Sequence, residues 1–254
     1  MPALHNAAAV VTGSGRGLGA ALAIALADAG CRPILCGRDP TGLERTAATI
    51  LDRSGVESTI IALDLADAGS VSAAVAAIRA RHESIDILIN NGAMWLERGS
   101  EPHTSAEVLG VINAAVSGAY LLTQDLLPLL HRSARPDIVT IGSISGLPNA
   151  ALQTAAVPFY AAKRAQDALA DGLAQMLNGT PVRSLVVHPP YLDDAEPDGE
   201  TWRLSPERAK GERATTRDIV EAVLFALSRP RHVSLSIVVD ADNGGRFAPM
   251  ISPR

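Results

Sequence analysis

The chain has 254 residues, which is enough for one domain with a sizeable hydrophobic core. Its net charge is -5 and no basic patch stands out, which argues against a nucleic-acid-binding protein. No run of ~18 apolar residues indicates a membrane span, and the N-terminus lacks the charged region of a signal peptide. We therefore expect a cytoplasmic protein. Its two cysteines, Cys31 and Cys36, lack the partners for a disulfide or a metal site, so we expect buried thiols and no bound metal.

Strand-like apolar runs alternate with helical patterns along the chain. The predicted strands are 7–12, 33–37, 57–63, 85–90, 137–142, 182–188 and 235–240. The predicted helices are 18–29, 42–53, 68–82, 105–115, 117–131, 159–177 and 216–228. This alternation predicts a Rossmann-type α/β fold: a doubly wound parallel sheet of about seven strands, flanked by helices, in one domain over residues 1–254.

The first predicted strand leads into a glycine-rich turn, and a helical pattern follows at once. Residues 12–19 read Thr-Gly-Ser-Gly-Arg-Gly-Leu-Gly. Glycines permit backbone angles that are closed to other residues, and they let a pyrophosphate come close to the main chain. The free N–H groups at the start of the helix then hold the phosphates. The turn therefore predicts a dinucleotide site formed by Gly13, Ser14, Gly15, Arg16, Gly17, Leu18 and Gly19.

Further motifs follow this turn in a fixed order. They are Asp64-Leu65 after the third strand, Asn90-Asn91-Gly92-Ala93 after the fourth, Gly142 to Gly146 after the fifth, Ala161-Ala162-Lys163 in a helix, and Asp240 to Gly245 near the end. Over nearly its whole length the chain thus resembles the short-chain dehydrogenase/reductase family. The resemblance implies a homodimeric or homotetrameric enzyme, joined through helices 117–131 and 159–177, that acts on a small organic molecule. It also implies further cofactor contacts at Asp64, Leu65, Asn91, Gly92, Lys163 and Pro189.

The end of the second strand bears on the choice of cofactor. It reads Cys36-Gly37-Arg38-Asp39. A dinucleotide without a 2′-phosphate is usually held by an acid at this place, which Gly37 occupies here. Arg38 and Arg16 can instead donate paired hydrogen bonds to a phosphate. These residues favour NADP(H) over NAD(H), although Asp39 could reach the ribose hydroxyls.

The family's catalytic set consists of an Asn, a Ser, a Tyr and a Lys, and the resemblance assigns the last three to Ser143, Tyr160 and Lys163. Ser143 and Lys163 match the motifs directly. Phe159, however, stands four residues before Lys163, where the tyrosine is expected, and Tyr160 stands three before. One residue turns a helix by ~100°. Pro158 and the long segment after Ser143 could shift the helix locally and bring Tyr160 into place.

Other positions of the reactive site also depart from the family. Ala115 stands where the Asn is expected. His188 and Tyr191, at the end of the sixth strand, are candidate proton carriers, with packing residues as the alternative. The substrate pocket is predicted to include Trp95, Ser145, His188 and Tyr191. The charged, Pro- and Gly-containing segment 191–213 is either a lid over this pocket or a solvated insertion.

Three functions remain open at this point. The first is an NADP(H)-dependent oxidoreductase that interconverts a carbonyl and an alcohol. The second is an enzyme on the same scaffold with other chemistry: reduction of another bond, an isomerisation or an elimination. The third is a non-catalytic NADP(H)-binding protein. Trp95 and Trp202 are two of few aromatic residues and hint at a ring-shaped or flat apolar substrate.

Overall fold

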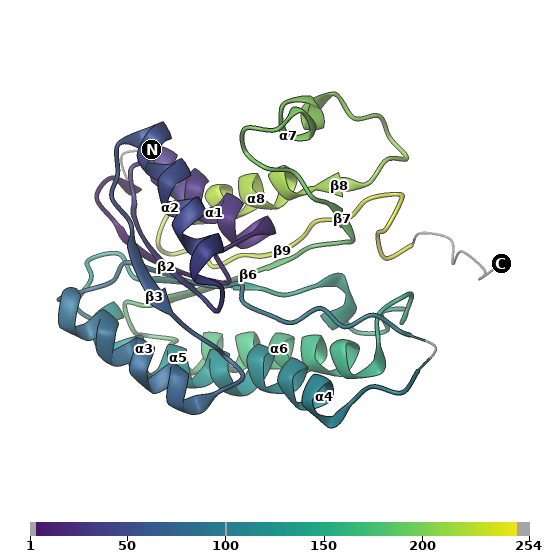
Figure 1. The fold of residues 1–254 in the computed structure, drawn as a ribbon, viewed down its shortest axis with the longest axis horizontal. Helices are drawn as coiled ribbons and strands as arrows, with labels where there is room; N and C mark the ends of the chain where they lie inside the picture. Colours follow the sequence, from purple (N-terminus) through teal and green to yellow (C-terminus); the bar gives the residue numbers. More distant parts are fainter. Residues whose placement is uncertain (1–3, 100, 248–254) are drawn as a thin grey trace.

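A seven-stranded parallel sheet forms the middle layer of the computed structural model, which describes residues 4–99 and 101–247 (Figure 1). The strands are β1 (Ala8–Thr12), β2 (Arg32–Gly37), β3 (Thr59–Ala62), β4 (Ile87–Asn90), β5 (Asp137–Ile141), β6 (Arg183–His188) and β9 (Ser236–Val238). Their order across the sheet is β3-β2-β1-β4-β5-β6-β9, which confirms the predicted doubly wound architecture. The order reverses beside β1, and ligands of such sheets bind at the carboxyl ends of the strands there.

Helices cover both faces of the sheet (Figure 1). One face carries α1 (Gly17–Asp28), α2 (Pro40–Ser54) and α8 (Thr216–Ser228). The other carries α3 (Ala68–Arg81), α4 (Ser105–Ile112), α5 (Ala119–Leu130) and α6 (Val157–Met176). Side chains alternate between the faces along each strand: Val11 and Leu35 pack in the core under α1, whereas Val10 and Ile34 pack in the core under α3 and α5.

The main difference from the predicted elements lies between residues 105 and 131. Two separate helices are expected there, but α4, a π-helical turn at Asn113–Gly118 and α5 form one continuous run. The predicted break at Val116 is absent. Within the run, Gly118 marks a close approach, because a Cβ atom there would lie 1.9 Å from the carbonyl oxygen of Leu65. The continuous helix is long and apolar enough to cross a membrane, by length and composition. No membrane span is predicted from the sequence, where two shorter helices are expected. In this fold it packs against α3 and α6.

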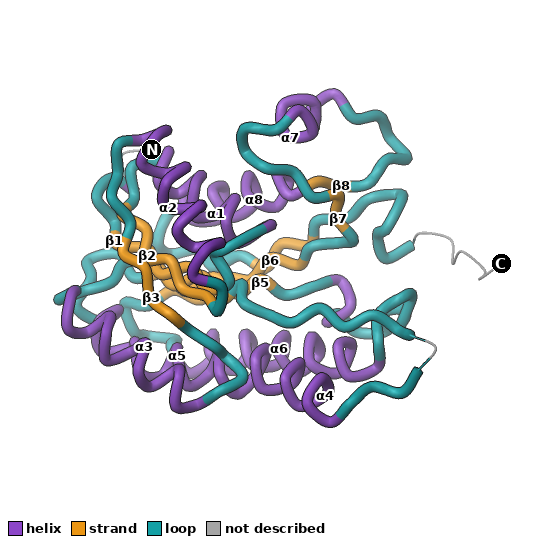
Figure 2. Tube along the Cα trace, viewed as in Figure 1, coloured by secondary structure: helices purple, strands orange, loops and turns teal. Residues whose placement is uncertain are grey.

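The segment 191–213 lies beside the sheet, outside its strand order (Figure 2). It contains α7 (Glu200–Leu204) and a 3₁₀ turn at Ser205–Glu207. At its base, β7 (Leu192–Asp193) pairs in parallel with β8 (Ala214–Thr215). The carboxylate of Asp193 also accepts a hydrogen bond from Arg208 at 2.8 Å. The segment is thus fixed where it leaves and rejoins the main body.

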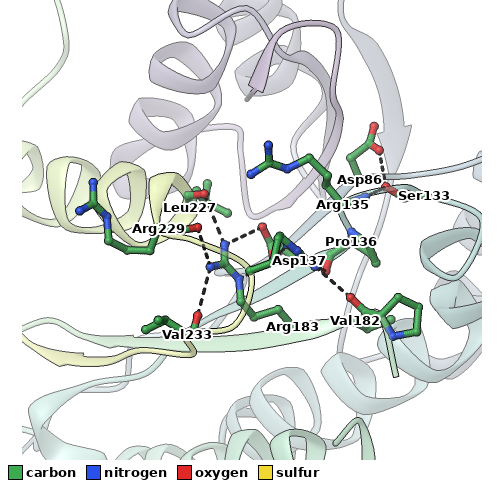
Figure 3. A network of polar contacts seen from close by, with 12 residues as sticks. Asp86, Ser133, Arg135, Pro136, Asp137, Val182, Arg183, Leu227, Arg229 and Val233 are labelled. Atoms are coloured by element: carbon green, nitrogen blue, oxygen red, sulfur yellow. Dashed lines mark hydrogen bonds and ion pairs between the residues drawn. The ribbon is translucent and has the colours of Figure 1, made fainter. Parts of the chain in front are cut away.

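A buried ion pair between Arg183 and Asp137 lies at the amino ends of β6 and β5, beside the end of α8 (Figure 3). The Nε and Nη2 atoms of Arg183 donate to the two carboxylate oxygens of Asp137 at 2.8 and 3.0 Å. Arg231 lies against the same carboxylate. The guanidinium of Arg183 also donates to main-chain carbonyls of Leu227, Arg229, Pro230 and Val233. One buried guanidinium therefore ties the end of α8 and the following turn to the sheet.

Candidate functional site

A cavity of about 1260 Å³ lies at the carboxyl ends of the strands. It runs from the glycine turn after β1, past the ends of β3 and β4, to the ends of β5 and β6. It brings together the predicted cofactor residues Gly13, Gly15, Arg16, Gly17, Leu18, Gly19, Arg38, Asp64, Leu65, Asn91, Gly92, Lys163 and Pro189. Ser14 lies outside this lining: it is fully buried, and its main-chain N–H donates to the carbonyl of Cys36 at 3.2 Å. Ser14 therefore holds the turn against β2.

The start of α1 provides a cradle for an anion. Among the described residues, no side chain caps this helix, and its first turn contains no acidic residue. Its unsatisfied N–H groups and the positive end of its dipole therefore face the cavity. The turn is tight at Gly19, where a Cβ atom would lie 2.1 Å from the carbonyl oxygen of Gly13. Gly17 has φ +53° and open space where a Cβ would project. This cradle fits the pyrophosphate of a dinucleotide.

The end of β2 fits a further phosphate. Arg16 and Arg38 are exposed and line the cavity together with Gly37. Asp39 also lines the cavity, but its Oδ1 atom accepts a hydrogen bond from the N–H of Thr41 at 3.2 Å and caps α2. One carboxylate oxygen is thus engaged within the protein, while both guanidinium groups remain beside the cavity.

Helix α6 presents Phe159 to the cavity, and Tyr160 is outside the described lining. The helix already begins at Val157, so residues 159 to 163 follow ordinary helical geometry and the fourth residue before Lys163 shares its face. The local shift that would bring in Tyr160 does not occur. The ring of Phe159 packs instead in an apolar cluster with Val111, Ala115, Ala155 and Ala162. The two positions where the family has Tyr and Asn therefore both lie in this cluster.

Lys163 and Ser143 both line the cavity. The Nζ atom of Lys163 donates to the carbonyl oxygen of Ile141 at 3.2 Å and to the Oε1 atom of Gln166 at 2.8 Å. Burial lowers the pKa of Lys163 from its ordinary 10.5 to about 8, because the charged form loses water. The Oγ atom of Ser143 accepts a hydrogen bond from the N–H of Ser145 at 3.1 Å, and its own O–H can serve as a donor to a ligand.

The predicted substrate residues divide into two groups. Trp95, Ser145 and Tyr191 line the cavity. His188 is buried behind it, with its Nε2 atom 3.5 Å from the Oδ1 atom of Asp167. Burial is the largest influence on His188 and lowers its pKa, while the nearby carboxylate of Asp167 opposes this shift. Trp202 also lies away from the cavity, packed against the core under α1 with its ring near Arg217.

Gln166 lies next to Lys163 in the site, although none of the sequence motifs includes it. Its side chain is fully buried and holds the amine of Lys163. A signal for it does exist, because residues three apart on a helix are neighbours and a polar residue follows Lys163 at that distance. The family motif ends at the lysine, so motif matching alone misses this contact.

Comparison with known proteins identifies the family. The sequence profile of the short chain dehydrogenase family matches residues 7–201. An uncharacterised oxidoreductase of Staphylococcus saprophyticus is 28% identical over 240 residues, which cover 94% of this chain and 98% of the relative. The chain belongs to the short-chain dehydrogenase family of oxidoreductases, as the motifs predict.

Solved structures agree with this assignment. A metagenomic short-chain oxidoreductase, crystallised in complex with NADP, is 26% identical with a TM-score of 0.74, covering 93% of this chain and 96% of that one. The L-sorbose reductase of Gluconobacter frateurii, solved with NADPH and L-sorbose, has a TM-score of 0.80 at 20% identity, covering 96% of this chain and 98% of that one. The second similarity concerns the fold alone.

Proposed function

We propose that this protein is an NADP(H)-dependent oxidoreductase that interconverts a carbonyl and an alcohol on a small organic substrate. One observation carries the proposal: a single cavity joins the uncapped start of α1, the guanidinium groups of Arg16 and Arg38, and the Ser143–Lys163 pair. The related metagenomic oxidoreductase that holds NADP supports the choice of cofactor. When bound, the nicotinamide supplies or takes the hydride.

Ser143 and Lys163 provide the protein's part of the reaction. The hydroxyl of Ser143 donates to the substrate carbonyl and polarises it. Lys163 gives a proton to the same oxygen as negative charge develops, and a pKa near 8 suits a general acid at neutral pH. Two of its three N–H groups are held by Ile141 and Gln166, which leaves the third for the substrate. Because Phe159 has no acidic proton, the lysine acts directly.

A second function, cofactor binding without carbonyl turnover, is favoured by the apolar cluster around Phe159. Phe159 and Ala115 stand where the family has its Tyr and Asn, and both are buried in this cluster. A sensor or a partner subunit must bind the nucleotide but does not need the polar groups that catalysis uses. The absence of both groups here fits such a protein. Such a protein binds NADPH but reduces no ketone.

The first experiment measures NADPH binding by fluorescence and ketone reduction by the loss of NADPH absorbance. We expect Ser143→Ala to lower kcat about 100-fold while the NADPH affinity stays the same. Tyr160→Phe is the matched control, since its side chain is outside the described lining, and should retain wild-type turnover. Tight NADPH binding without turnover across a broad ketone panel would favour the second function. Loss of turnover in Tyr160→Phe would contradict the role given to Lys163.

Cofactor preference has its own test at the end of β2. Gly37→Asp places a carboxylate beside Arg38, where it would repel a 2′-phosphate. We expect the NADPH Kd of this variant to rise at least about tenfold while NADH binds as well as before or better, since like charges brought together cost a few kcal/mol. Fluorescence titration with both cofactors measures this. Equal affinity of the wild-type protein for NADH and NADPH would contradict the preference.

We also propose that segment 191–213 acts as a lid. Part of the cavity wall comes from its first residues, namely Tyr191, Leu192, Asp194, Ala195 and Glu196, whereas no residue of α7 is in the lining. Limited proteolysis within residues 208–213 should slow when NADPH is present, and equal cleavage rates would contradict a lid.

We further propose a homodimer or homotetramer acting in the cytoplasm, a reducing compartment that suits the free buried thiols of Cys31 and Cys36.

A further inference from the structure

Three aromatic side chains form one wall of the cavity next to Lys163. This aromatic wall consists of Trp95, Phe159 and Tyr191, all of which line the cavity. The Trp95 ring centroid lies 4.6 Å from that of Phe159 and 5.7 Å from that of Tyr191, both in edge-to-face geometry. Trp95 is 51% exposed although it lies in the cavity lining. A large apolar ring thus presents open surface to whatever binds there.

The rings come from three separate segments that are tied together. Glu97 and Ala155 form an antiparallel bridge, and the N–H of Ala156 donates to the carbonyl of Leu96 at 3.0 Å. These bonds join the segment of Trp95 to the start of α6. The hydroxyl of Thr154 donates to the phenol oxygen of Tyr191 at 3.2 Å, which links the third ring to the same loop. The wall is therefore preorganised, and a ligand binding there has little ordering cost.

The long segment between Ser143 and Phe159 supplies the ties of this wall. It contains Asn149 and Gln153 with φ of 59° and 49°, a left-handed conformation that costs energy in residues other than glycine. The Gln153 side-chain amide donates to the carbonyl of Gly245 at 3.1 Å and anchors the loop at the opposite side. Backbone strain that is held in place by specific contacts beside a cavity indicates a loop shaped for binding.

The groups around the wall disfavour ligands of either charge. The rings carry no charge, and the amine of Lys163, 5.9 Å from the Phe159 ring centroid, would repel a cationic substrate. Asp194 and Glu196 line the same cavity and would repel an anionic substrate. Open aromatic surface gains most from an apolar partner with a π-face, because aromatic pairs add attraction beyond the area that they bury. The wall therefore matches a flat, neutral ring.

We propose that the substrate is an uncharged carbonyl compound bearing a planar ring, with the ring against Trp95 and the carbonyl directed at Ser143 and Lys163. This inference rests on the proposed function. With NADPH bound, the cofactor would supply a hydride to the carbonyl carbon and Lys163 would give a proton to the oxygen, so the products would be an alcohol and NADP⁺. The amine of Lys163 regains its proton from water. Trp95 is thus a specificity-determining residue.

The test compares acetylnaphthalene with dodecanone, a linear methyl ketone with the same number of carbon atoms, by calorimetry on the protein saturated with NADP⁺. We expect the planar ketone to bind about tenfold tighter. Trp95→Ala should lose this preference, whereas Trp95→Phe, which keeps a ring, should retain most of it. Trp202→Phe is the matched control and should bind both ketones like the wild type. Equal affinity for the two ketones, or an unchanged preference in Trp95→Ala, would overturn the proposal.

Fluorescence gives a second readout that does not depend on turnover. The chain has two tryptophans, so in Trp202→Phe the tryptophan emission comes from Trp95 alone. We expect acetylnaphthalene to quench this emission in a saturable way, with the same Kd as calorimetry gives. Quenching with NADPH binding but no reduction would contradict the proposed function and leave the ring site standing. Reduction of dodecanone as efficient as that of acetylnaphthalene would overturn the ring site and leave the oxidoreductase standing.

Discussion

The amine of Lys163 is buried, and burial disfavours its charged form. Its pKa is lowered to about 8 from 10.5, so between these values the unfolded chain binds more protons and stability rises with pH. Below pH 8 the amine is charged in both states, and burial costs about 3 kcal/mol, from the size of the pKa shift. Lys163→Met removes this cost. We expect the free energy of unfolding of this variant, measured with urea, to exceed that of the wild type most strongly below pH 8. The difference should shrink by about 3 kcal/mol toward pH 10.5.

Lys210→Met is the matched control for this pH dependence. The side chain of Lys210 is 86% exposed and pairs with Asp242 at the surface. Its replacement should give a stability difference that is small and nearly constant over the same pH range. A constant difference for Lys163→Met as well would mean that the buried amine titrates like an exposed one, and the general-acid role would lose its support.

At the residue scale, helical and strand periodicity decide what the sequence can predict. Phe159 and Tyr160 stand four and three residues before Lys163, and both spacings make neighbours on a helix, so spacing alone does not decide which ring faces the cavity. The predicted local shift that would bring in Tyr160 is absent because the helix keeps its phase from Val157. Side chains alternate along a strand, so His188 faces the opposite way from Val187, which packs under α1. His188 therefore points toward Asp167 of α6. The contact between Gln166 and Lys163 depends on side-chain rotamers, which periodicity does not fix.

At the scale of the elements, the Asp137–Arg183 pair should contribute strongly to the stability of the sheet. Both side chains are buried, and Arg183 has further bonds to main-chain carbonyls. Removing one partner strands the other charge, so Asp137→Asn and Arg183→Met should each lower the free energy of unfolding by about 3–5 kcal/mol. Urea unfolding of each variant measures this loss.

The double variant separates the ion pair from general disruption. Asp137→Asn with Arg183→Met leaves no stranded charge in this pair, so it should lose less than the sum of the single losses. Arg231 is 29% exposed and lies against the same carboxylate, and Arg231→Met should cost less than Arg183→Met because water can replace its charge. Single losses that simply add would show that the two residues act independently.

The elements themselves follow closely from the pattern of apolar residues. Strands buried on both faces give short apolar runs, and the strands and helices that flank the cofactor cleft begin and end within a few predicted residues. The run from Ser105 to Leu130 is the exception, because the sequence predicts two helices, 105–115 and 117–131, with a break at Val116. The close approach of Gly118 to Leu65 within this run is a tertiary contact that no local pattern encodes.

At the scale of the whole molecule, the fold follows from the alternation of elements, but the assembly of copies depends on which surfaces remain apolar. Tyr120 of α5 and Met176 of α6 are large apolar side chains with 37% and 52% exposure, on the helices predicted to join subunits. Burying such surface between copies is favourable at about 25 cal/mol per Å². The proposed dimer or tetramer would use these helices.

Sedimentation velocity tests this assembly. We expect the wild type to sediment as a dimer or tetramer and Tyr120→Glu or Met176→Glu to shift it toward the monomer, because a carboxylate buried without a partner at an interface costs several kcal/mol. Phe225→Glu is the matched control: Phe225 is 50% exposed but lies on α8, on the other side of the sheet, and its replacement should leave the assembly unchanged. A monomeric wild type would contradict the assembly outright. Dissociation by Phe225→Glu, with the other two variants still assembled, would move the interface to the α8 side.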